Sequence, residues 1–409
     1  MIQLEKTLVE RTLGFLKDRR SRILNGSINS IPSPFKRFSD DFIGVEQAKY
    51  YVITSSTKGA KTQFASFIFI FNTLLYAYHH PEQCKVKIFY YPLEETPEDV
   101  MTRFMSYILF NISKGKIRIA PIDLTSSKND KPLSSDIIEL LESEEYQNIL
   151  KFFQSNIIFS ESTNPTGVYN ECKKYAEEHG TVHKKRQKVK DDFGNIKEID
   201  AFDYYEQNNP DEYKIIFFDH VSLTTTERGL SLKQSIDKLS EYCVILRNRY
   251  KYTPVVIQQQ AFAGESLDAF KENKVRPSIA NLADSKYPSR DANVVLGLFS
   301  PFKYELREYL GYDITVLRDN VRFIEVLVNR GGSPGGLAAL YFDGAVNFFE
   351  ELPPPNDNGM QKIYTFLKNK RKVNKVLLAY GEKIINKKLH KDNIFTTFAA
   401  QIKNKFKIK

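Results

Sequence analysis

Eight residues have the types and the spacing of a phosphate-binding loop. The apolar run YYVIT is followed by the octapeptide Ser55, Ser56, Thr57, Lys58, Gly59, Ala60, Lys61 and Thr62. These residues occupy the places of the pattern G-x-x-x-x-G-K-T, in which backbone amides surround phosphates, the lysine meets the β- and γ-phosphates and the threonine holds Mg²⁺. Both motif glycines are replaced, by Ser55 and Ala60. The octapeptide therefore predicts an ATP and Mg²⁺ site, with an ordinary strand-to-helix turn as the alternative.

Two acids and a glutamine stand where a hydrolytic phosphate site needs them. Asp219 ends the apolar run KIIFFD, Glu94 follows KVKIFYYPL, and Gln260 ends PVVIQQQ. Such a site needs a metal-side carboxylate and a group that activates water. Ligand sites of open parallel sheets form at the carboxyl ends of strands, so Lys61 is expected to meet these three side chains there. The alternative for either acid alone is a turn or helix cap.

The elements that must position these residues alternate between strands and helices, which predicts a mostly parallel sheet covered on both faces. The expected strands are nearly all apolar, as central parallel strands should be. They lie at 50–54, 85–93, 156–160, 214–219 and 254–260, and helices are expected at 3–24, 63–80, 97–112, 170–180 and 231–250. Strands at 294–299, 322–329 and 337–344 are interpreted as antiparallel additions, and the polar residues 181–212 as a surface insertion.

Composition indicates a folded intracellular protein. Of 409 residues, 42% are apolar and 27% are charged, which is typical of a globular chain. Three widely separated cysteines form no metal-like cluster and fit a reducing compartment. The charged start is no secretory signal, and the longest apolar run, FASFIFIF, is too short to span a bilayer. We expect a cytoplasmic protein without a membrane partner; abundant Lys, Asn, Tyr, Ile and Phe with no Trp favour an AT-rich phage or bacterial genome.

The positive charge belongs to the C-terminal segment. Residues 361–409 contain 14 lysines and arginines against two acids, so this segment carries +12 and the rest of a chain with a total of +9 carries −3. Such a segment suits phosphate backbones or an acidic partner. The alternative is a solvated tail that only aids solubility.

Several segments occur in the order found in one helicase family. YYPLEET resembles F-S-L-E-M-S, FFDHVSL resembles I-D-Y-L-Q-L, PVVIQQQ resembles P-V-I-A-L-S-Q, and VLVNRGGSPGG resembles the K-x-R-x-G segment. IPSPFKRFSDDFIG and RPSIANLADSKYPSRDANVVLGLF also have counterparts. Between residues 31 and 353 the chain resembles the C-terminal motor domain of the DnaB-family replicative DNA helicases. The resemblance implies an α/β RecA-like P-loop NTPase core with a mostly parallel central sheet flanked by helices.

The resemblance implies roles for the residues at the strand ends. Lys61 and Thr62 would bind ATP and Mg²⁺, and Asp219 would support the metal. Glu94 would polarise the attacking water, and Gln260 would report the γ-phosphate. Together these residues imply an ATP hydrolase.

Arg330 matches the family's arginine finger, which reaches the nucleotide of a neighbouring subunit, so the resemblance implies a homohexamer. An arginine supplied across an interface stabilises charge during phosphoryl transfer and makes hydrolysis depend on assembly. An ion pair within the subunit is the alternative.

Residues 281–290 resemble the family's DNA-facing loop. The family's arginine is Ala283 here and its glycine is Lys286, so the expected contacts to single-stranded DNA are Ser285, Lys286, Tyr287 and Arg290, with Tyr287 as a stacking group. A solvated loop without a ligand is the alternative. The resemblance further implies 5′ to 3′ translocation, unwinding at a replication fork, and a primase or helicase loader as partner.

The domain boundaries expected from this interpretation are an amphipathic linker helix at 1–30, a RecA-like domain at 31–353 and a basic extension at 354–409. No segment corresponds to the family's N-terminal primase-interacting domain. Val328 stands where the family has a lysine. Together with Ser55 and Ala60, this departure favours an alternative function. The alternative is a hydrolysis-impaired ring that binds nucleotide or DNA as a scaffold or regulator. The retained strand-end residues favour an active helicase, and a recombination-type or clock-type RecA-like ATPase is a third interpretation.

Overall fold

The computed structural model describes residues 7–190, 196–261 and 275–369. Most of the predicted basic extension therefore lies outside the described residues. The chain forms two compact units, one made of Met1–Glu305 with Asp319–Leu352 and the other of Leu306–Arg318 with Pro353–Lys409. The predicted boundaries at residues 30 and 353 stay predictions.

The first unit is built on a nine-stranded sheet with the order β15-β14-β13-β10-β3-β9-β8-β4-β5. Its six strands from β10 to β5 are parallel, and β13 to β15 extend it antiparallel. This confirms the predicted mostly parallel sheet. The bounds are β3 Tyr51–Ser55, β4 Lys85–Pro92, β5 Ile157–Phe159, β8 Glu212–Asp219, β9 Thr253–Gln259, β10 Val294–Phe299, β13 Val321–Asn329, β14 Leu337–Asp343 and β15 Phe348–Glu351.

The prediction for one strand was wrong. The strand at 294–299, expected to be antiparallel, is β10 and runs parallel to β3, with Val294 opposite Tyr51. It is antiparallel only to β13. A strand that is apolar on both faces carries no signal of its direction, and here the chain returns through α11 (Tyr287–Asp291) to start β10 at the same edge as β3. The strands at 322–329 and 337–344 are antiparallel additions, as predicted.

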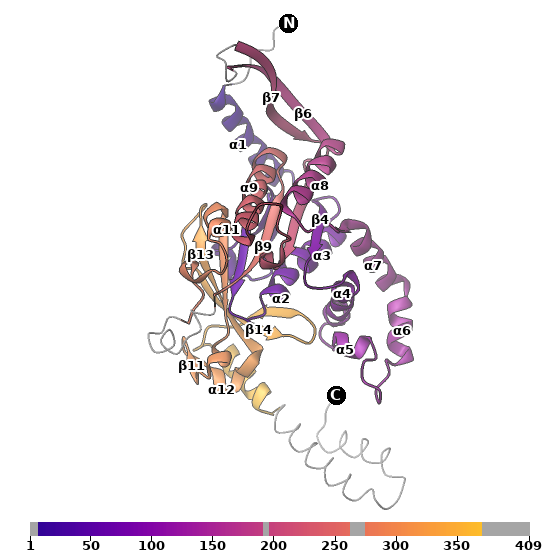
Figure 1. Ribbon diagram of the computed structural model, residues 1–409. Helices are drawn as coiled ribbons and strands as arrows, with labels where there is room; N and C mark the ends of the chain where they lie inside the picture. Colours follow the sequence, from indigo (N-terminus) through magenta and orange to yellow (C-terminus); the bar gives the residue numbers. More distant parts are fainter. Residues whose placement is uncertain (1–6, 191–195, 262–274, 370–409) are drawn as a thin grey trace, which may run out of the picture. The chain divides into compact units, whose positions relative to one another are not determined.

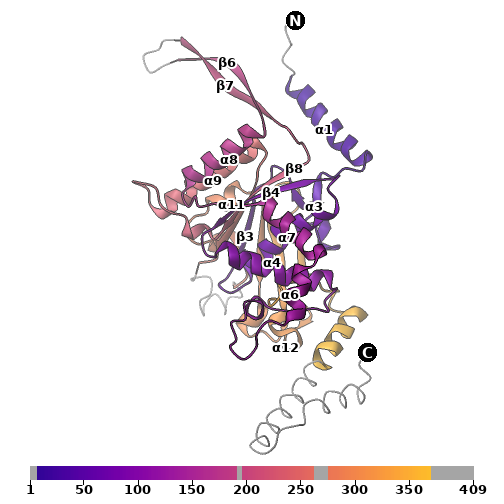
Figure 2. The same ribbon diagram turned by 90° about the vertical axis from the view of Figure 1, so that its right-hand side faces the viewer.

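Helices cover both faces of this sheet (Figures 1 and 2). Alternate residues of the central strands enter two separate cores, as the two-residue side-chain period requires. Tyr90 lies in the core beneath α2 to α4 and α7, whereas Tyr91 lies in the core beneath α8 and α9. The bounds are α2 Lys61–Ser66, the π-helical segment η2 Phe67–Asn72, α3 Thr73–His79, α4 Pro97–Ile112, α7 Glu144–Asn156, α8 Pro165–Glu178 and α9 Leu232–Tyr250.

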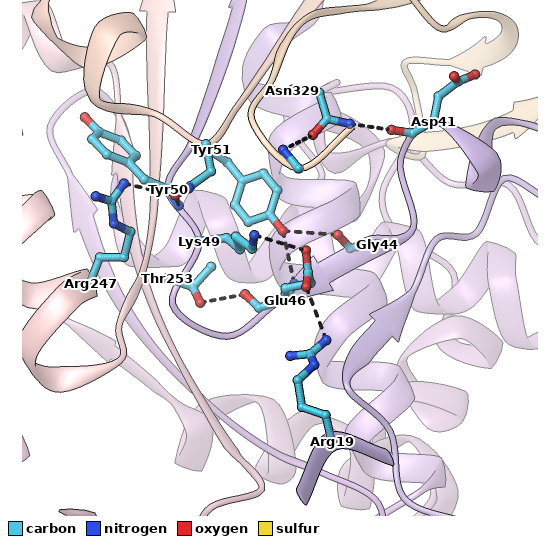
Figure 3. Close-up of polar contacts among 12 residues, drawn as sticks. Arg19, Asp41, Gly44, Glu46, Lys49, Tyr50, Tyr51, Arg247, Thr253 and Asn329 are labelled. Carbon is cyan, nitrogen blue, oxygen red and sulfur yellow. Dashed lines mark hydrogen bonds and ion pairs between the residues drawn. The ribbon is translucent and has the colours of Figure 1, made fainter. Parts of the chain in front are cut away.

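Helix α1 (Leu8–Leu24) begins with a capping box between Thr7 and Glu10. Its base is attached to the rest of the first unit by an ion pair from Arg19 to Glu46 at 3.5 Å (Figure 3). A second ion pair joins Arg22 to Asp211 at 2.6 Å. Several apolar side chains of α1 are exposed and do not pack on the rest of this unit. They are Val9, Leu13, Phe15, Leu16, Ile23 and Leu24.

The predicted surface insertion contains an antiparallel hairpin of β6 (Gly180–Lys190) and β7 (Ile196–Gln207), which pair only with each other among the described residues. The hairpin extends away from the sheet in both views (Figures 1 and 2). Its base is fixed by Tyr205, whose hydroxyl donates to the carbonyl of Ala176 at 2.9 Å. Most of its other side chains are exposed, so it contributes little to the core.

The remaining elements of the first unit are short. They are β1 Ser30–Pro32, η1 Phe38–Asp40, β2 Gly44–Glu46, α5 Pro121–Leu124, α6 Ser135–Glu142, η3 Val221–Leu223, η5 Ile279–Asn281 and η6 Pro301–Tyr304. The described part of the second unit holds β11 Glu308–Tyr309, β12 Tyr312–Asp313, α12 Ile314–Leu317 and a helix at 358–369. A further turn, η7 Arg318–Asn320, joins α12 to β13.

The described helices and cysteines carry no sign of a membrane span or a metal cluster. None of the helices in the described ranges is long and apolar enough to cross a membrane. All three cysteines are buried, and within the same ranges no group of three or more His, Cys, Asp or Glu side chains could hold a metal ion.

Candidate active site

The predicted phosphate-binding loop lies between the carboxyl end of β3 and the first turn of α2. Gly59 has no room for a side chain, because a Cβ there would lie 2.5 Å from the Ser55 hydroxyl oxygen. Ala60 adopts the left-handed conformation, with φ 71° and ψ 28°. The loop thus keeps the backbone shape that normally calls for glycine, although alanine occupies the left-handed position.

Substituting Ala60 with glycine is expected to stabilise the protein by about 1 kcal/mol, because an L-residue in this conformation is strained. Chemical denaturation measures the change. The matched control is Ala65→Gly in the buried face of α2, which should instead destabilise by at least about 0.5 kcal/mol. A destabilised Ala60→Gly variant would show that the loop does not have the described backbone conformation.

Thr62 and Asp219 meet at the carboxyl edge of the sheet. The Thr62 hydroxyl donates to Asp219 Oδ1 at 3.0 Å, and the Tyr90 hydroxyl donates to Oδ2 at 3.3 Å. Burial raises the pKa of Asp219, while the hydrogen bond from Thr62 and the charge of Arg103 oppose that change. A hydroxyl and a carboxylate are hard oxygen donors of the kind Mg²⁺ prefers, with the remaining positions left to phosphates and water. The pair therefore fits a Mg²⁺–nucleotide ligand set.

Lys61 and Glu94 belong to the same cluster. Burial lowers the pKa of Lys61, and the charges of Glu94 and Asp219 oppose that change. The Glu94 side chain is exposed, just beyond β4. Four predicted residues, Lys61, Thr62, Glu94 and Asp219, are thus brought together at one edge, with a cation, two metal-side oxygens and a solvent-accessible carboxylate.

Gln259, the last residue of β9, and Gln260, which follows it, face different ways. Gln260 is buried, donates to the Thr54 hydroxyl at 2.7 Å and accepts from the Ser278 amide at 3.1 Å. Gln259, which was not predicted, donates to the Thr57 hydroxyl of the loop at 2.6 Å and accepts from His220 at 3.1 Å. The neighbouring glutamine therefore contacts the phosphate-binding loop, because the pleat turns successive side chains to opposite faces.

Two more cations near the loop were not predicted from the sequence. Lys303, in η6 just beyond β10, donates to the Thr57 carbonyl at 2.9 Å. Arg322, at the start of β13, is buried and donates to the Gly59 carbonyl at 3.3 Å. The sheet order explains both positions. Strand β10, which precedes Lys303, lies beside β3, and β13, which carries Arg322, lies one strand further. In the sequence, the only signal for Lys303 is its place shortly after the end of an expected strand, and Arg322 has no such signal.

Arg330 lies at the opposite edge of the sheet. Because β13 is antiparallel to β10, Phe323 is opposite Phe299 at the loop edge and Asn329 is opposite Val294 at the far edge. The length of β10 separates the two edges by roughly 20 Å. Arg330 donates to the Ala292 carbonyl at 2.9 Å and also to the Arg290 carbonyl. It is exposed, and it cannot reach the phosphate-binding loop of its own chain.

The turn that carries Arg330 is held by Asn329. The Asn329 side chain accepts from the Gly331 amide at 3.0 Å and donates to the Asp41 carbonyl at 3.5 Å (Figure 3). Arg247 lies near Arg330. Burial lowers the pKa of Arg247, and the charge of Arg330 lowers it further. The guanidinium of Arg330 donates to carbonyl oxygens rather than to a carboxylate, which does not support the alternative of an ion pair within the subunit.

The predicted DNA loop divides into buried and exposed residues. Ser285 is buried and its hydroxyl donates to Asp237. Lys286, Tyr287 and Arg290 are exposed at the start and on the surface of α11. The Arg290 guanidinium lies 5.7 Å from the centre of the Tyr287 ring. An aromatic ring with cations beside it is a combination that can contact single-stranded nucleic acid.

Comparison with solved structures identifies the architecture. The chain is similar to a solved structure described as an ATPase domain, with a TM-score of 0.59 and 14% identity over 86% of this chain and 100% of that one. It is also similar to a DnaB-like replicative helicase, described with its interactions with primase, with a TM-score of 0.56 and 14% identity over 86% of this chain and 68% of that one. The fold is that of a RecA-like ATPase domain. No family model and no curated protein matches the sequence.

The RecA-like fold accounts for how the predicted residues are distributed. Ligands of open α/β sheets bind outside the carboxyl ends of the strands, which is where Lys61, Thr62, Glu94 and Asp219 meet. Arg330 is at the amino ends of the parallel strands, at the edge opposite that site. The described fold thus places the cluster of Lys61, Thr62, Glu94 and Asp219 at one edge of the sheet and an exposed arginine at the other.

Proposed function

We propose that the protein is an ATP-driven motor that assembles as a homohexamer, translocates on single-stranded DNA and unwinds duplex at a replication fork. The observation that carries the proposal is the hydrogen bond between Thr62 and Asp219 at the edge shared with Lys61 and Glu94. Phosphoryl transfer to water requires a cation, ligands for a metal ion and a group that activates water. Lys61 would supply the first, Thr62 and Asp219 the second, and Glu94 the third.

ATP would lie along the loop from Ser55 to Thr62, with Lys61 on its β- and γ-phosphates. Mg²⁺ would be held by Thr62 and Asp219 and would offset charge on the transferred phosphoryl group. Glu94 would orient the attacking water. The DnaB resemblance assigns the sensing of the γ-phosphate to Gln260. The contact between Gln259 and Thr57 favours Gln259 for that role instead.

Assembly completes the site. Arg330 is too far from its own loop, so it can act only on nucleotide held by a second copy. A neighbouring Arg330 in each interface would stabilise the transition state and make hydrolysis depend on the ring. The exposed apolar side chains of α1 support the same assembly, because an amphipathic helix of this kind requires a surface to cover it.

Single-stranded DNA would contact Lys286, Tyr287 and Arg290, which are exposed. Substituting Lys286 or Arg290 with alanine is expected to weaken binding to all sequences alike and to reduce the salt slope of log K by about 0.7 for each phosphate that is no longer neutralised. Fluorescence anisotropy of a labelled oligonucleotide at several salt concentrations measures both effects. Arg249→Ala, which removes an exposed arginine from α9, is the control for loss of charge alone; an equal effect there would contradict the assignment.

A second candidate function is a ring that binds nucleotide or DNA without productive hydrolysis and serves as a scaffold or regulator. Two observations favour it: alanine in the left-handed position of the loop, and Val328 two residues before Arg330, where the resembling family has a lysine. The retention of Arg330 and of the four residues at the loop edge weighs against this second function. Those four residues are Lys61, Thr62, Glu94 and Asp219. A primase or a helicase loader would be the protein partner in either case.

Strand displacement distinguishes the two functions. A forked duplex is incubated with ATP and with the assembled protein, and the released strand is measured for forks with a 5′ or a 3′ single-stranded arm. Unwinding that needs ATP and a 5′ arm supports the helicase. A ring that binds the fork and nucleotide but releases no more strand than its Glu94→Gln variant is a scaffold.

A further inference from the structure

A buried tyrosine contacts the carboxylate that is proposed to hold Mg²⁺. The hydroxyl of Tyr90 in β4 donates to Asp219 Oδ2, while Thr62 donates to Oδ1. Each oxygen of the carboxylate thus has one donor among the described residues. Because Tyr90 and Asp219 are both fully buried, the hydroxyl has no water to exchange for this bond, and it restricts how the carboxylate can rotate.

The charge of Arg103 in α4 acts on both buried residues, since it lowers the pKa of Tyr90 and of Asp219 against the effect of burial. The Arg103 guanidinium pairs with Glu95, and the arginine side chain is only 12% exposed. The pair thus places one cation and one carboxylate beside Tyr90 and Asp219. The buried Nε of Arg103 has no hydrogen-bond partner among the described residues. A buried, partly unpaired arginine is costly for stability alone, so an electrostatic role beside Asp219 is the better explanation.

We propose that Tyr90, in the field of the Arg103–Glu95 ion pair, is a positioning residue that orients Asp219 toward a nucleotide-bound Mg²⁺. The inference rests on the proposed function, since it needs the site to bind Mg²⁺ with nucleotide. Tyr90 acts through Asp219 and contacts neither metal nor nucleotide. Partners one shell away from a metal ligand fix its orientation, and their loss costs roughly 10- to 100-fold in metal affinity.

The chain offers a matched control on the next residue. Tyr91 is also fully buried, but it faces the other core, where its hydroxyl donates to Glu171 at 3.1 Å. Tyr90 stacks on Phe217 at 5.1 Å and Tyr91 stacks on Phe218 at 4.7 Å, so phenylalanine keeps the ring contact at either position. Tyr90→Phe and Tyr91→Phe each remove one buried hydroxyl from the same strand, and only the first removes it from Asp219.

The test measures Mg²⁺-dependent binding of a fluorescent ADP analogue to the full-length protein, with no turnover involved. We expect Tyr90→Phe to raise the Mg²⁺ concentration at half-maximal effect by roughly tenfold, with unchanged affinity in EDTA and unchanged values for Tyr91→Phe. Mn²⁺ bound in the presence of ADP, measured by electron paramagnetic resonance, should weaken in parallel. Arg103→Met should weaken Mg²⁺ binding at least as much, and Arg103→Lys should restore part of it.

Three results would overturn the inference, and they can be distinguished from one another. If Tyr90→Phe matches the wild type while Asp219→Asn loses the Mg²⁺ dependence, Asp219 binds the metal without help from Tyr90. If the wild type shows no Mg²⁺ dependence at all, the proposed function fails and the positioning role fails with it. Equal shifts in Tyr90→Phe and Tyr91→Phe would likewise count against the inference, by assigning the effect to loss of a buried hydroxyl. Should Arg103→Met not fold, the tyrosine pair still decides the outcome.

Discussion

Rings made only of Arg330→Ala subunits are expected to lose about 10³-fold or more in kcat for ATP, because an arginine supplied across an interface has an effect of that size on phosphoryl transfer. Nucleotide binding should persist, since Arg330 lies at the edge of the sheet opposite the phosphate-binding loop. Phosphate release from particles of checked mass measures the loss.

Mixed rings identify the subunit on which Arg330 acts. Lys61→Ala subunits keep Arg330 but cannot bind nucleotide productively, and Arg330→Ala subunits have the reverse defect. Neither ring should hydrolyse ATP alone, yet a mixture should recover part of the activity, because some interfaces then combine an intact loop with an intact arginine. A mixture as inactive as its components would contradict action across the interface, as would Arg330→Ala rings that keep full turnover. Arg249→Ala is the control for an exposed arginine.

Substituting Glu94 with glutamine is expected to lower kcat by about 10²- to 10⁴-fold, the usual contribution of a group that activates water. Nucleotide and single-stranded DNA should bind as before, because the Glu94 side chain is exposed and the change removes only its charge and basicity. Single-turnover hydrolysis of ATP measures the chemical step.

Two neighbouring glutamates make this prediction specific. Glu98→Gln, on the exposed first turn of α4, should leave turnover unchanged. Glu95→Gln should act mainly through the Mg²⁺ dependence, because Glu95 pairs with Arg103. A larger loss of kcat at saturating Mg²⁺ for Glu95→Gln than for Glu94→Gln would move the water-activating role to Glu95.

Much of the fold could be predicted because its central strands are unusually apolar. Runs such as KIIFFD and PVVIQQQ have the length of strands, and helical patterns separate them. The direction of β10 could not be predicted, since a strand buried on both faces looks the same whichever way it runs. Neither could the β6–β7 hairpin, whose exposed strands carry no alternation of apolar and polar residues.

Site residues at the ends of strands could be predicted from the sequence. Site residues whose role depends on the face of the sheet that their side chain takes could not. Asp219 ends one apolar strand and Glu94 follows another, so the topology alone brings them to Lys61. Which of three consecutive glutamines meets the loop depends on the face that each side chain takes, and identical residues give no signal for it. Likewise, nothing in YYP distinguishes Tyr90, which contacts Asp219, from its neighbour.

The most direct test of the central claim is steady-state ATP hydrolysis by the intact protein, with and without single-stranded DNA, compared with its Glu94→Gln variant on rings of equal mass. We expect turnover that DNA stimulates and that Glu94→Gln abolishes. An intact ring that binds nucleotide and DNA yet hydrolyses ATP no faster than Glu94→Gln would contradict the motor function and leave the scaffold in its place.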